Sequence, residues 1–469
     1  MASAETTNPT AAQASREQSE ALVLRVLHRR GIVSARGFRD ASFAGVPLAA
    51  IADATRLSRP SVYAVRDAYT VGGDSPVLTS DIRGDDGRFR GPLRLRSDLG
   101  YAVGVDFGPR HARVAIADVH GQLYADQRAE EHFPIGRPPE LYLDWAASNI
   151  QRLMSEAGVG RDEVIGVGIS QVAPINVRTG YPHPNGLTNK AWRDVSVARQ
   201  LARRLDWGDI SVVSDNDTNL RTLVEHECGA ARGLDVVAYV NWSNHVGFGL
   251  IIGGSVYRGS HGYAGELGHR PISGGAGLCP RCGREGCLEV MISAAGIARA
   301  LGAPEDALPA AGEVIFRRIA EERAAGESAV FDQVNEATRY LAETVALIVD
   351  TLDPDAVLLA GSMGARIHDN TALLATFRST LESSHMGFAD NLSILEPTLG
   401  AESAVRGAIL RVLSERLVPW ARGRLAAAST PATSAARSAK DDRRGDRRLL
   451  DSSGQRISRR SVSKTKNQG

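Results

Sequence analysis

The sequence predicts an α/β protein of two lobes that face each other across a cleft, with a small winged helix domain in front of them. Three observations support this fold class. The chain has 469 residues, more than one ordinary domain needs. From Gly100 onward, apolar segments of strand length alternate with segments of helical period. Ahead of these segments lies an arginine-rich region with the spacing of a helix-turn-helix.

Composition limits the class of protein. Hydrophobic residues make up 43% of the chain, which is enough for sizeable cores. No apolar run approaches the roughly 20 residues of a membrane-spanning helix, and no secretory signal begins the sequence. We therefore expect a cytoplasmic protein with no membrane partner.

The two ends of the chain differ from its middle. Residues 1–18 are small and polar, and we expect them to be disordered. Residues 421–469 carry 13 basic and 4 acidic residues and few large apolar ones, which predicts a disordered basic tail. Such a tail is either a solvated end or a weak, salt-sensitive contact with nucleic acid, and the sequence leaves both open.

Residues 19–98 are predicted to form the winged helix domain. In "PLAAIADATRLSRPSVYAVRDAY", the apolar residues are spaced so that two short helices pack together across a tight turn. Ser58 stands where an N-cap belongs, and Pro60 falls in the first turn, where proline costs no hydrogen bond. The segment "PVLTSDIRGDDGRFRGPLRLRSD" then predicts a two-stranded wing with Asp-Asp-Gly at its tip.

The expected partner of this domain is operator DNA. The second helix of such a unit presents its N-terminal side chains to the major groove, and the wing reaches the minor groove or the phosphates. Two-helix corners also occur in proteins that never touch DNA, but the two-stranded hairpin that follows the helices favours the DNA interpretation. The residues expected to face DNA are Arg59, Ser61, Tyr63 and Arg66 on the helix and Arg88 and Arg90 on the wing.

Residues 99–420 are predicted to form the two lobes. In the first lobe we expect strands in "YAVGVDFGPRHARVAIADVHGQLYA", "VIGVGISQV" and "ISVVSDND", and a helix in "DVSVARQLARRL". In the second, "VVAYVNWSNHVGFGLIIGGSVYRG" predicts a hairpin, and "FDQVNEATRYLAETVALIVDTLDPDAVLLAGSMG" predicts a long helix, a buried strand and a glycine turn. Clefts between such lobes hold ligands near the strand ends.

A metal site is predicted in "ELGHRPISGGAGLCPRCGREGCLE", which begins at Glu266 and holds three of the four cysteines of the chain. Proline and glycine between Cys279, Cys282 and Cys287 favour turns that let the thiolates converge. With His269 the set is Cys3His, typical of structural zinc. Three clustered thiols cannot pair evenly as disulfides. The lone Cys228 is expected to be a small buried hydrophobe.

Several motifs, taken in order, resemble the ROK family of repressors, open reading frames and sugar kinases, which has the actin-like ATPase (ribonuclease H-like) fold. The resemblance covers residues 20–420, and the front domain is similar to the winged helix of the family's transcriptional repressors. Two residues, Pro280 and Arg281, separate the first two clustered cysteines, where the family usually has one. The motifs are "GVDFG" (104–108), "SDNDTN" (214–219), "GSVYRGSHGYAGELGH" (254–269), the cysteine cluster, "DPDAVLLAGSMG" (353–364) and "GAESAVRGA" (400–408).

The resemblance implies a site for a pyranose sugar. In family kinases the position of Asp217 is the general base that takes a proton from the attacking hydroxyl. A metal-clamped loop would hold the hydroxyl-binding side chains rigid in advance. The implied sugar ligands are Asn216, Asp217, Glu266, His269 and Glu289.

The phosphate loops depart from those of the family kinases. "DxGGTK" is replaced by "DFGPRHA", where Pro109 lacks an amide donor and Arg110 replaces the threonine. "GTGVGGG" is replaced by "SNHVGFG", so side chains at residues 243–245 fill space that phosphates would need. We therefore expect that ATP and Mg²⁺ do not bind, and that Asp217 is a vestigial base.

These observations favour a repressor whose kinase-like domain senses a sugar or sugar phosphate. An active, glucokinase-like, ATP-dependent sugar kinase with an attached DNA-binding domain is the main alternative, and a DNA-binding protein without a ligand is a third. Family resemblance and the two-fold symmetry of operators predict a homodimer or homotetramer.

Overall fold

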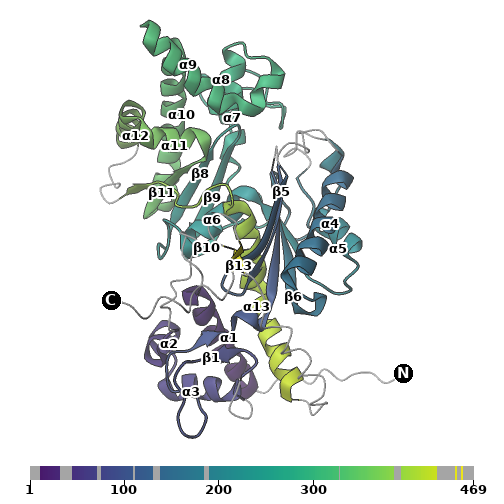
Figure 1. Ribbon diagram of the computed structural model, residues 1–469. Helices are drawn as coiled ribbons and strands as arrows, with labels where there is room; N and C mark the ends of the chain where they lie inside the picture. The colour runs from purple at the N-terminus through teal and green to yellow at the C-terminus, as the bar shows by residue number, and fades with distance from the viewer. Residues whose placement is uncertain are drawn as a thin grey trace, which may run out of the picture.

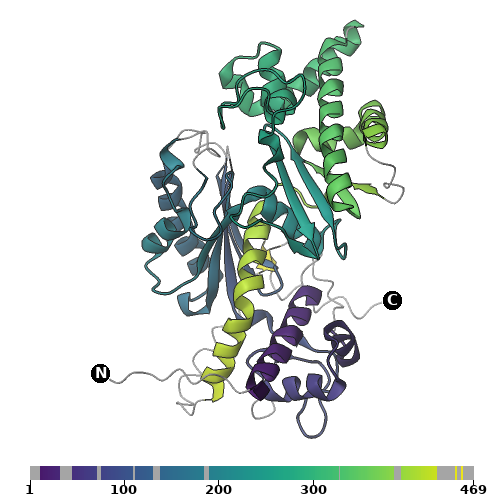
Figure 2. The ribbon, with the colours of Figure 1, turned by 180° about the vertical axis from the view of Figure 1, so that it is seen from behind.

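The structure, a computed structural model, places a winged helix domain against one end of two α/β lobes (Figure 1). A long C-terminal helix runs from the lobes to this domain (Figure 2). Among the described residues, no helix combines the length and apolar character needed to cross a membrane. The described residues are 11–31, 45–70, 75–108, 111–129, 138–183, 190–326, 328–384, 392–429, 449–450 and 456–457.

The winged helix domain has the elements that its sequence predicts. The apolar faces of its helices are buried together with Phe89 of the wing, and Ser58 caps the second helix by accepting a hydrogen bond from Ser61 N at 3.2 Å. Gly87, with φ +75°, forms the tip of the wing. Its elements are α1 (Ala11–Gly31), α2 (Leu48–Thr55), α3 (Arg59–Ala68), β1 (Leu78–Thr79), β2 (Arg94–Leu95) and the 3₁₀ turn η1 (Ser97–Leu99).

Helix α1 corrects the expected N-terminal boundary, because residues 11–18 are helical rather than disordered. Its second half buries Val23, Leu24 and Leu27 in the core of the domain. Packing stabilises that part, and helix propagation back from it costs little. The ion pair between Arg16 and Glu20, at 3.1 Å and four residues apart, supports the extension.

The first lobe is a five-stranded sheet in the order β5-β4-β3-β6-β7, in which β3, β6 and β7 are parallel and the other pairs antiparallel. Helices α4 and α5 cover one face. All the strands and the helix expected here are present. The elements are β3 (Tyr101–Phe107), β4 (Ala112–Asp118), β5 (Leu123–Ala129), α4 (Pro139–Ala157), η2 (Arg161–Glu163), β6 (Val164–Gln171), η4 (Lys190–Trp192), α5 (Val197–Leu205) and β7 (Val212–Asn216).

The second lobe repeats this plan in the order β10-β9-β8-β11-β12, with an antiparallel hairpin followed by parallel strands. The hairpin, long helix and buried strand expected from the sequence are confirmed. The elements are β8 (Val237–Trp242), β9 (Val246–Ile252), β10 (Ser255–Val256), η5 (Glu266–His269), α7 (Leu288–Ile292), α8 (Ala294–Ala300), η6 (Glu305–Ala310), α9 (Ala311–Ala325), α10 (Ala329–Leu352), β11 (Ala356–Ala360), α11 (Gly361–Asp369), α12 (Thr371–Ser384) and β12 (Ser393–Leu395).

Two helices join the lobes. Helix α6 (Asp217–Cys228) leaves β7 of the first lobe and packs on β9 of the second, where glycines 247 and 249 leave room for Thr218 and Thr222. Helix α13 (Ser403–Ser429) packs against α6 and against β3 and β6. A side chain at Gly168 of β6 would collide with the backbone of Ala408 in α13. Glycine at these positions is therefore required by close approach.

Helix α13 also corrects the expected C-terminal boundary. It continues through residue 420 to Ser429, and Arg422 of this extension contacts Glu20 of α1 at 3.4 Å. Alanine, leucine and arginine dominate this stretch and are strong helix formers. Farther along, β13 (Leu449–Leu450) pairs antiparallel with β14 (Arg456–Ile457), so disorder is not correct there. The rest of the expected tail lies outside the described residues, as do residues 1–10.

The packing of α13 on the first sheet gives a stability prediction. Gly168→Ala should lower the free energy of unfolding by about 1–3 kcal/mol, because the added methyl group meets backbone that cannot yield. Gly423→Ala, on an exposed stretch of the same helix with nothing near it, should leave stability unchanged or raise it by up to about 1 kcal/mol. Urea denaturation of both variants checks this, and equal midpoints would contradict it.

Candidate ligand cleft, metal cluster and DNA-facing surface

The structure brings the four expected metal ligands together. The candidate ligand atoms of His269, Cys279, Cys282 and Cys287 all lie within 4.8 Å of one another. The Cys282 and Cys287 sulfurs are 3.4 Å apart, and Cys279 Sγ lies 3.6 Å from His269 Nδ1. This donor set fits a tetrahedral, thiophilic cation. The cluster could therefore hold a metal ion.

The backbone of the cysteine loop explains this convergence. Cys279 N donates to Arg284 O at 2.8 Å, and Gly283 N donates to Cys279 O at 2.9 Å, so the chain reverses between the first two cysteines and the third. Gly283 has φ +71°, which glycine adopts without strain. Burial and the neighbouring thiols raise the pKa of Cys287 to about 12. Ionising several thiols here therefore requires a compensating positive charge.

Four of the five expected sugar ligands line one small cavity of about 40 Å³ between the lobes: Asn216, Asp217, Glu266 and His269. Glu289 lies just behind the wall of this cavity. His245 and Arg281, which both line the cavity, contact the Glu289 carboxylate at 3.3 Å and 3.7 Å. Glu289 therefore holds the lining residues in place in this structure.

The electrostatics of the cavity differ from one carboxyl to the next. Burial raises the pKa of Asp217, although Arg221 opposes the rise. Desolvation by the surrounding protein also raises the pKa of Glu266, and the Arg281 charge opposes this rise. The Glu266 side chain nevertheless remains accessible to water from the cleft. Burial alone would raise the pKa of Glu289, but the His245 hydrogen bond and the Arg281 charge lower it to about 2. The site therefore mixes a firmly ionised carboxylate with two that protonate more easily.

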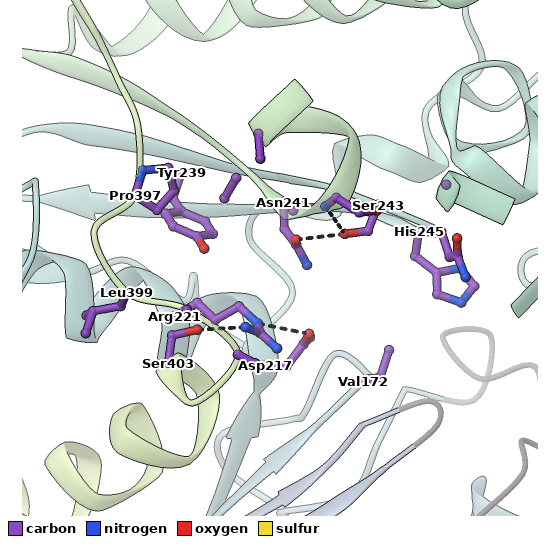
Figure 3. A pocket seen from close by; sticks show the side chains of 18 of the residues that line it. Val172, Asp217, Arg221, Tyr239, Asn241, Ser243, His245, Pro397, Leu399 and Ser403 are labelled. Carbon is purple, nitrogen blue, oxygen red and sulfur yellow. Dashed lines mark hydrogen bonds and ion pairs between the residues drawn. The ribbon is translucent and has the colours of Figure 1, made fainter. Parts of the chain in front are cut away.

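Asn216 has a structural role as well as a place in the cavity. Its side-chain oxygen accepts from Thr218 N at 2.9 Å and Asn219 N at 3.2 Å, which caps α6. Its amide group donates to Ala173 O at 3.1 Å. The cap fixes Asp217 as the first residue of α6, and the side chain of Asp217 points into the cleft (Figure 3).

A larger cavity of about 510 Å³ lies next to the small one and shares Asp217 with it (Figure 3). Arg221, one helical turn after Asp217, donates to Ser403 Oγ at 2.7 Å and lies 3.8 Å from the Asp217 carboxylate. Opposite them, Ser243 Oγ donates to Asn241 Oδ1 at 3.3 Å. The cavity is therefore lined by the cation of Arg221 on one side and by the polar side chains of Asn241 and Ser243 on the other.

The two altered phosphate loops border this larger cavity. His111 Nε2 hydrogen-bonds to the buried Asp106 carboxylate at 2.8 Å. Burial alone would raise the pKa of Asp106, but this hydrogen bond holds it below its ordinary value. In the second loop, Ser243 Oγ accepts from Ser362 N at 3.3 Å, at the start of α11. In both loops, polar side chains thus make hydrogen bonds within the protein. Pro109 and Arg110 lie outside the described residues.

The expected DNA-facing residues separate into two groups. Arg59 and Tyr63 are exposed on α3, Ser61 is half-buried, and Arg88 and Arg90 are exposed on the wing. These five residues form one continuous face of the domain only if the wing is held against α3. Arg66 makes that connection.

Arg66 does not face solvent, which corrects its expected role. It is 6% exposed, donates to Phe89 O of the wing at 3.0 Å and to Asp67 Oδ1 at 2.7 Å, and lies over the Tyr63 ring. The apolar contacts of Val62 and Val65 rotate this face of α3 inward. Arg66 therefore fixes the wing on the helix.

The sequence reasoning missed three residues of the cleft. Arg221 follows Asp217 by four residues, so the helical period itself places both on one face. Arg281 is one of the two residues between the first two clustered cysteines, and that unusual spacing was its signal. His111 carried no such signal, because its contact with Asp106 depends on the pairing of β3 with β4.

Comparisons with known proteins place this geometry in a family. The profile of the ROK family matches residues 102–415. The chain is 24% identical over 354 residues to the xylose repressor of Bacillus subtilis (strain 168), covering 75% of this chain and 84% of that protein. It is 28% identical to the crystal structure of the ROK hexokinase from Thermus thermophilus, with a TM-score of 0.53, covering 66% of this chain and 97% of that one.

A third comparison extends into the front domain. The crystal structure of a ROK family transcriptional regulator, a homologue of the Escherichia coli Mlc protein, covers 88% of this chain and 99% of its own. The TM-score is 0.64 at 17% identity, which establishes a shared fold. The chain belongs to the ROK family, and its lobes have the mixed α/β fold of that family's actin-like sugar kinases.

Proposed function

We propose that this protein is a DNA-binding transcriptional regulator, acting as a repressor, whose ROK domain senses a sugar or sugar derivative. One observation carries the proposal: α6 begins in the small cavity at Asp217 and ends at the winged helix domain. Glu227, in its last turn, pairs with Arg29 of α1 at 3.2 Å. A change at the cavity therefore has a rigid element through which to reach the DNA-binding domain.

Further contacts between the domain and the lobes support a mechanical connection. His28 Nδ1 donates to Val119 O at 2.9 Å, and His120 Nε2 donates to Leu95 O at 3.1 Å. Burial lowers the pKa of His28, so this ring is neutral near pH 7. The domain is docked on the lobes by buried hydrogen bonds rather than joined by a free linker, and we infer that its position follows the state of the cleft.

The kinase alternative rests on relatives with that activity and on Asp217. A glucokinase of Halalkalibacterium halodurans is 25% identical over 321 residues. Two contacts argue against the alternative. Arg221 lies 3.8 Å from the Asp217 carboxylate, and His111 hydrogen-bonds to the Asp106 carboxylate. The Arg221 charge opposes the rise in the pKa of Asp217 and so weakens this carboxylate as a general base. These contacts favour a sensor over a catalyst.

In this proposal a zinc ion binds the Cys3His cluster and gives the sugar site rigidity. When bound, zinc neutralises the thiolates and holds the loop in one conformation. The residues of this chain do the rest: Glu266 and Asp217 accept hydrogen bonds from sugar hydroxyls. The loop holds Glu266, and the capped start of α6 holds Asp217. The extended contact with DNA is supplied by Arg59, Arg88 and Arg90.

Loss of one thiolate tests the metal. Purified wild-type protein should contain about one zinc per chain, and Cys282→Ser should lose most of it, because three ligands hold the ion far less tightly than four. Cys228→Ser, which removes a buried thiol outside the cluster, is the control and should keep its zinc. Metal analysis by mass spectrometry measures both, and zinc-free wild-type protein would contradict the proposal.

Arginine substitutions test the DNA-facing surface. On the sequence that the wild-type protein selects from a random DNA pool, Arg59→Ala should weaken binding by about 1–3 kcal/mol if it reads a base edge. Arg88→Ala should weaken binding to every sequence and reduce the salt dependence. Arg152→Ala, an exposed arginine on α4, is the control. Fluorescence anisotropy measures affinity, and unchanged binding in both test variants would move the DNA surface elsewhere.

Glu266→Gln tests the sensor. D-Xylose and D-glucose serve as probes, and at least one should change DNA affinity without ATP and without conversion to a sugar phosphate. Reciprocity requires DNA to change sugar affinity by the same factor. Glu266→Gln should abolish the response and leave ligand-free DNA binding intact, whereas Glu285→Gln, on the exposed part of the same loop, should behave as wild type. Phosphorylation that needs ATP and disappears in Asp217→Ala would instead establish the kinase.

A further inference from the structure

The cleft between the lobes is divided into three compartments of very different size. The cavity of about 510 Å³ shares Asp217 and His245 with the one of about 40 Å³. The latter shares Glu266 and His269 with a third of about 200 Å³ on its other side. The narrowest compartment is thus the one in which the expected hydroxyl-binding residues meet.

The narrow compartment is too small for a sugar. A single water needs about 10–15 Å³ of such space, so about 40 Å³ holds roughly three waters. A hexose ring with its hydroxyls needs several times more. A ring that binds here therefore needs more space than the lining side chains leave in this structure.

Arg281 is a long, buried side chain at this compartment. It lines the narrow compartment and neither of the two larger ones. Its side chain is 9% exposed, so the guanidinium is almost wholly inside the protein. It donates to Val172 O at 3.2 Å and lies 3.7 Å from the Glu289 carboxylate.

The contact with Val172 also links the two lobes. Val172 directly follows β6 of the first lobe, whereas Arg281 belongs to the cysteine loop of the second. Nearby, Val177 N donates to His261 O at 3.2 Å and Asn176 Nδ2 donates to Tyr263 Oη at 3.2 Å, again from one lobe to the other. The Arg281 side chain therefore joins the two lobes beside the narrow compartment.

The cysteine loop lets this side chain move without the backbone. Hydrogen bonds from Cys279 N and Gly283 N fix the chain on both sides of Arg281. The arginine side chain itself turns about four single bonds, and Arg heads keep their charge while changing partners. A ligand can thus displace the guanidinium and leave the cluster intact.

We propose that Arg281 is a specificity-determining plug: it occupies the ring position in the ligand-free protein, and only a sugar that displaces it can bind. The inference rests on the proposed sugar-sensing function. The unusual two-residue spacing between Cys279 and Cys282 is what brings this side chain into the site. In the ligand-free protein, the contact between Arg281 and Val172 helps to keep the lobes together. A sugar must break this contact before its hydroxyls can bind the cavity.

Removal of the plug tests this on the full chain. Arg281→Ala should bind D-glucose or D-xylose at least about tenfold more tightly than wild type, because no charge-assisted hydrogen bond has to be broken. Arg281→Lys keeps the charge on a head group without the guanidinium fork and should lie between the two. Arg178→Ala, which changes an exposed arginine of the first lobe outside the three compartments, should match wild type. Calorimetry measures affinity, and zinc analysis confirms that each variant keeps its cluster.

A second measurement needs no sugar. Hydrogen exchange of the Val177 amide, which bonds across the lobes, should be several times faster in Arg281→Ala than in wild type or Arg178→Ala. If wild type binds a probe and Arg281→Ala binds it equally or less tightly, the plug is refuted and the sensor stands. If no variant binds either probe, the sensor is contradicted, and unchanged exchange at Val177 would refute the plug as well.

Discussion

The crossing of α6 and α13 is the contact on which the rest of the molecule depends. Gly407 of α13 has no side chain at the point where the backbone of Leu220 in α6 passes, and any larger residue would push the helices apart. Beside this crossing, the buried Asp215 carboxylate accepts from Arg411 of α13 at 2.8 Å and from Arg258 of the second lobe at 2.7 Å. One helix pair and one carboxylate thereby hold both lobes and orient the winged helix domain.

Two glycines of β9 serve the packing of α6 on the second sheet. Glycines 247 and 249 of β9 lie in the segment that the family resemblance compares with a phosphate loop of sugar kinases, and they make room for Thr218 and Thr222 of α6. Packing against α6 is thus enough to explain why these two positions are glycine, without phosphate binding.

Charge in the cleft is balanced by two arginines that the sequence places next to carboxylates. Arg221 lies near Asp217, which lines the small cavity, and Arg281 lies near Glu289 behind its wall. Buried carboxylates without such partners would take up protons. Partnered in this way, they remain available as acceptors, but a ligand must compete for them. This competition gives selectivity, because only a ligand with well-placed hydroxyls replaces the arginine contacts that the carboxylates lose.

The sequence by itself determined the elements and the candidate metal ligands, because both depend on local spacing: strand and helix periods, the N-cap at Ser58, and cysteines separated by two and four residues. It did not determine where α1 begins or where α13 ends, since packing against distant residues extended both helices. It could not show that Arg66 points inward to the wing or that Arg281 lies buried at the small cavity between the lobes. Those two arginines are decided by partners far away in the chain, Phe89 and Val172, which only the tertiary structure brings within hydrogen-bonding distance.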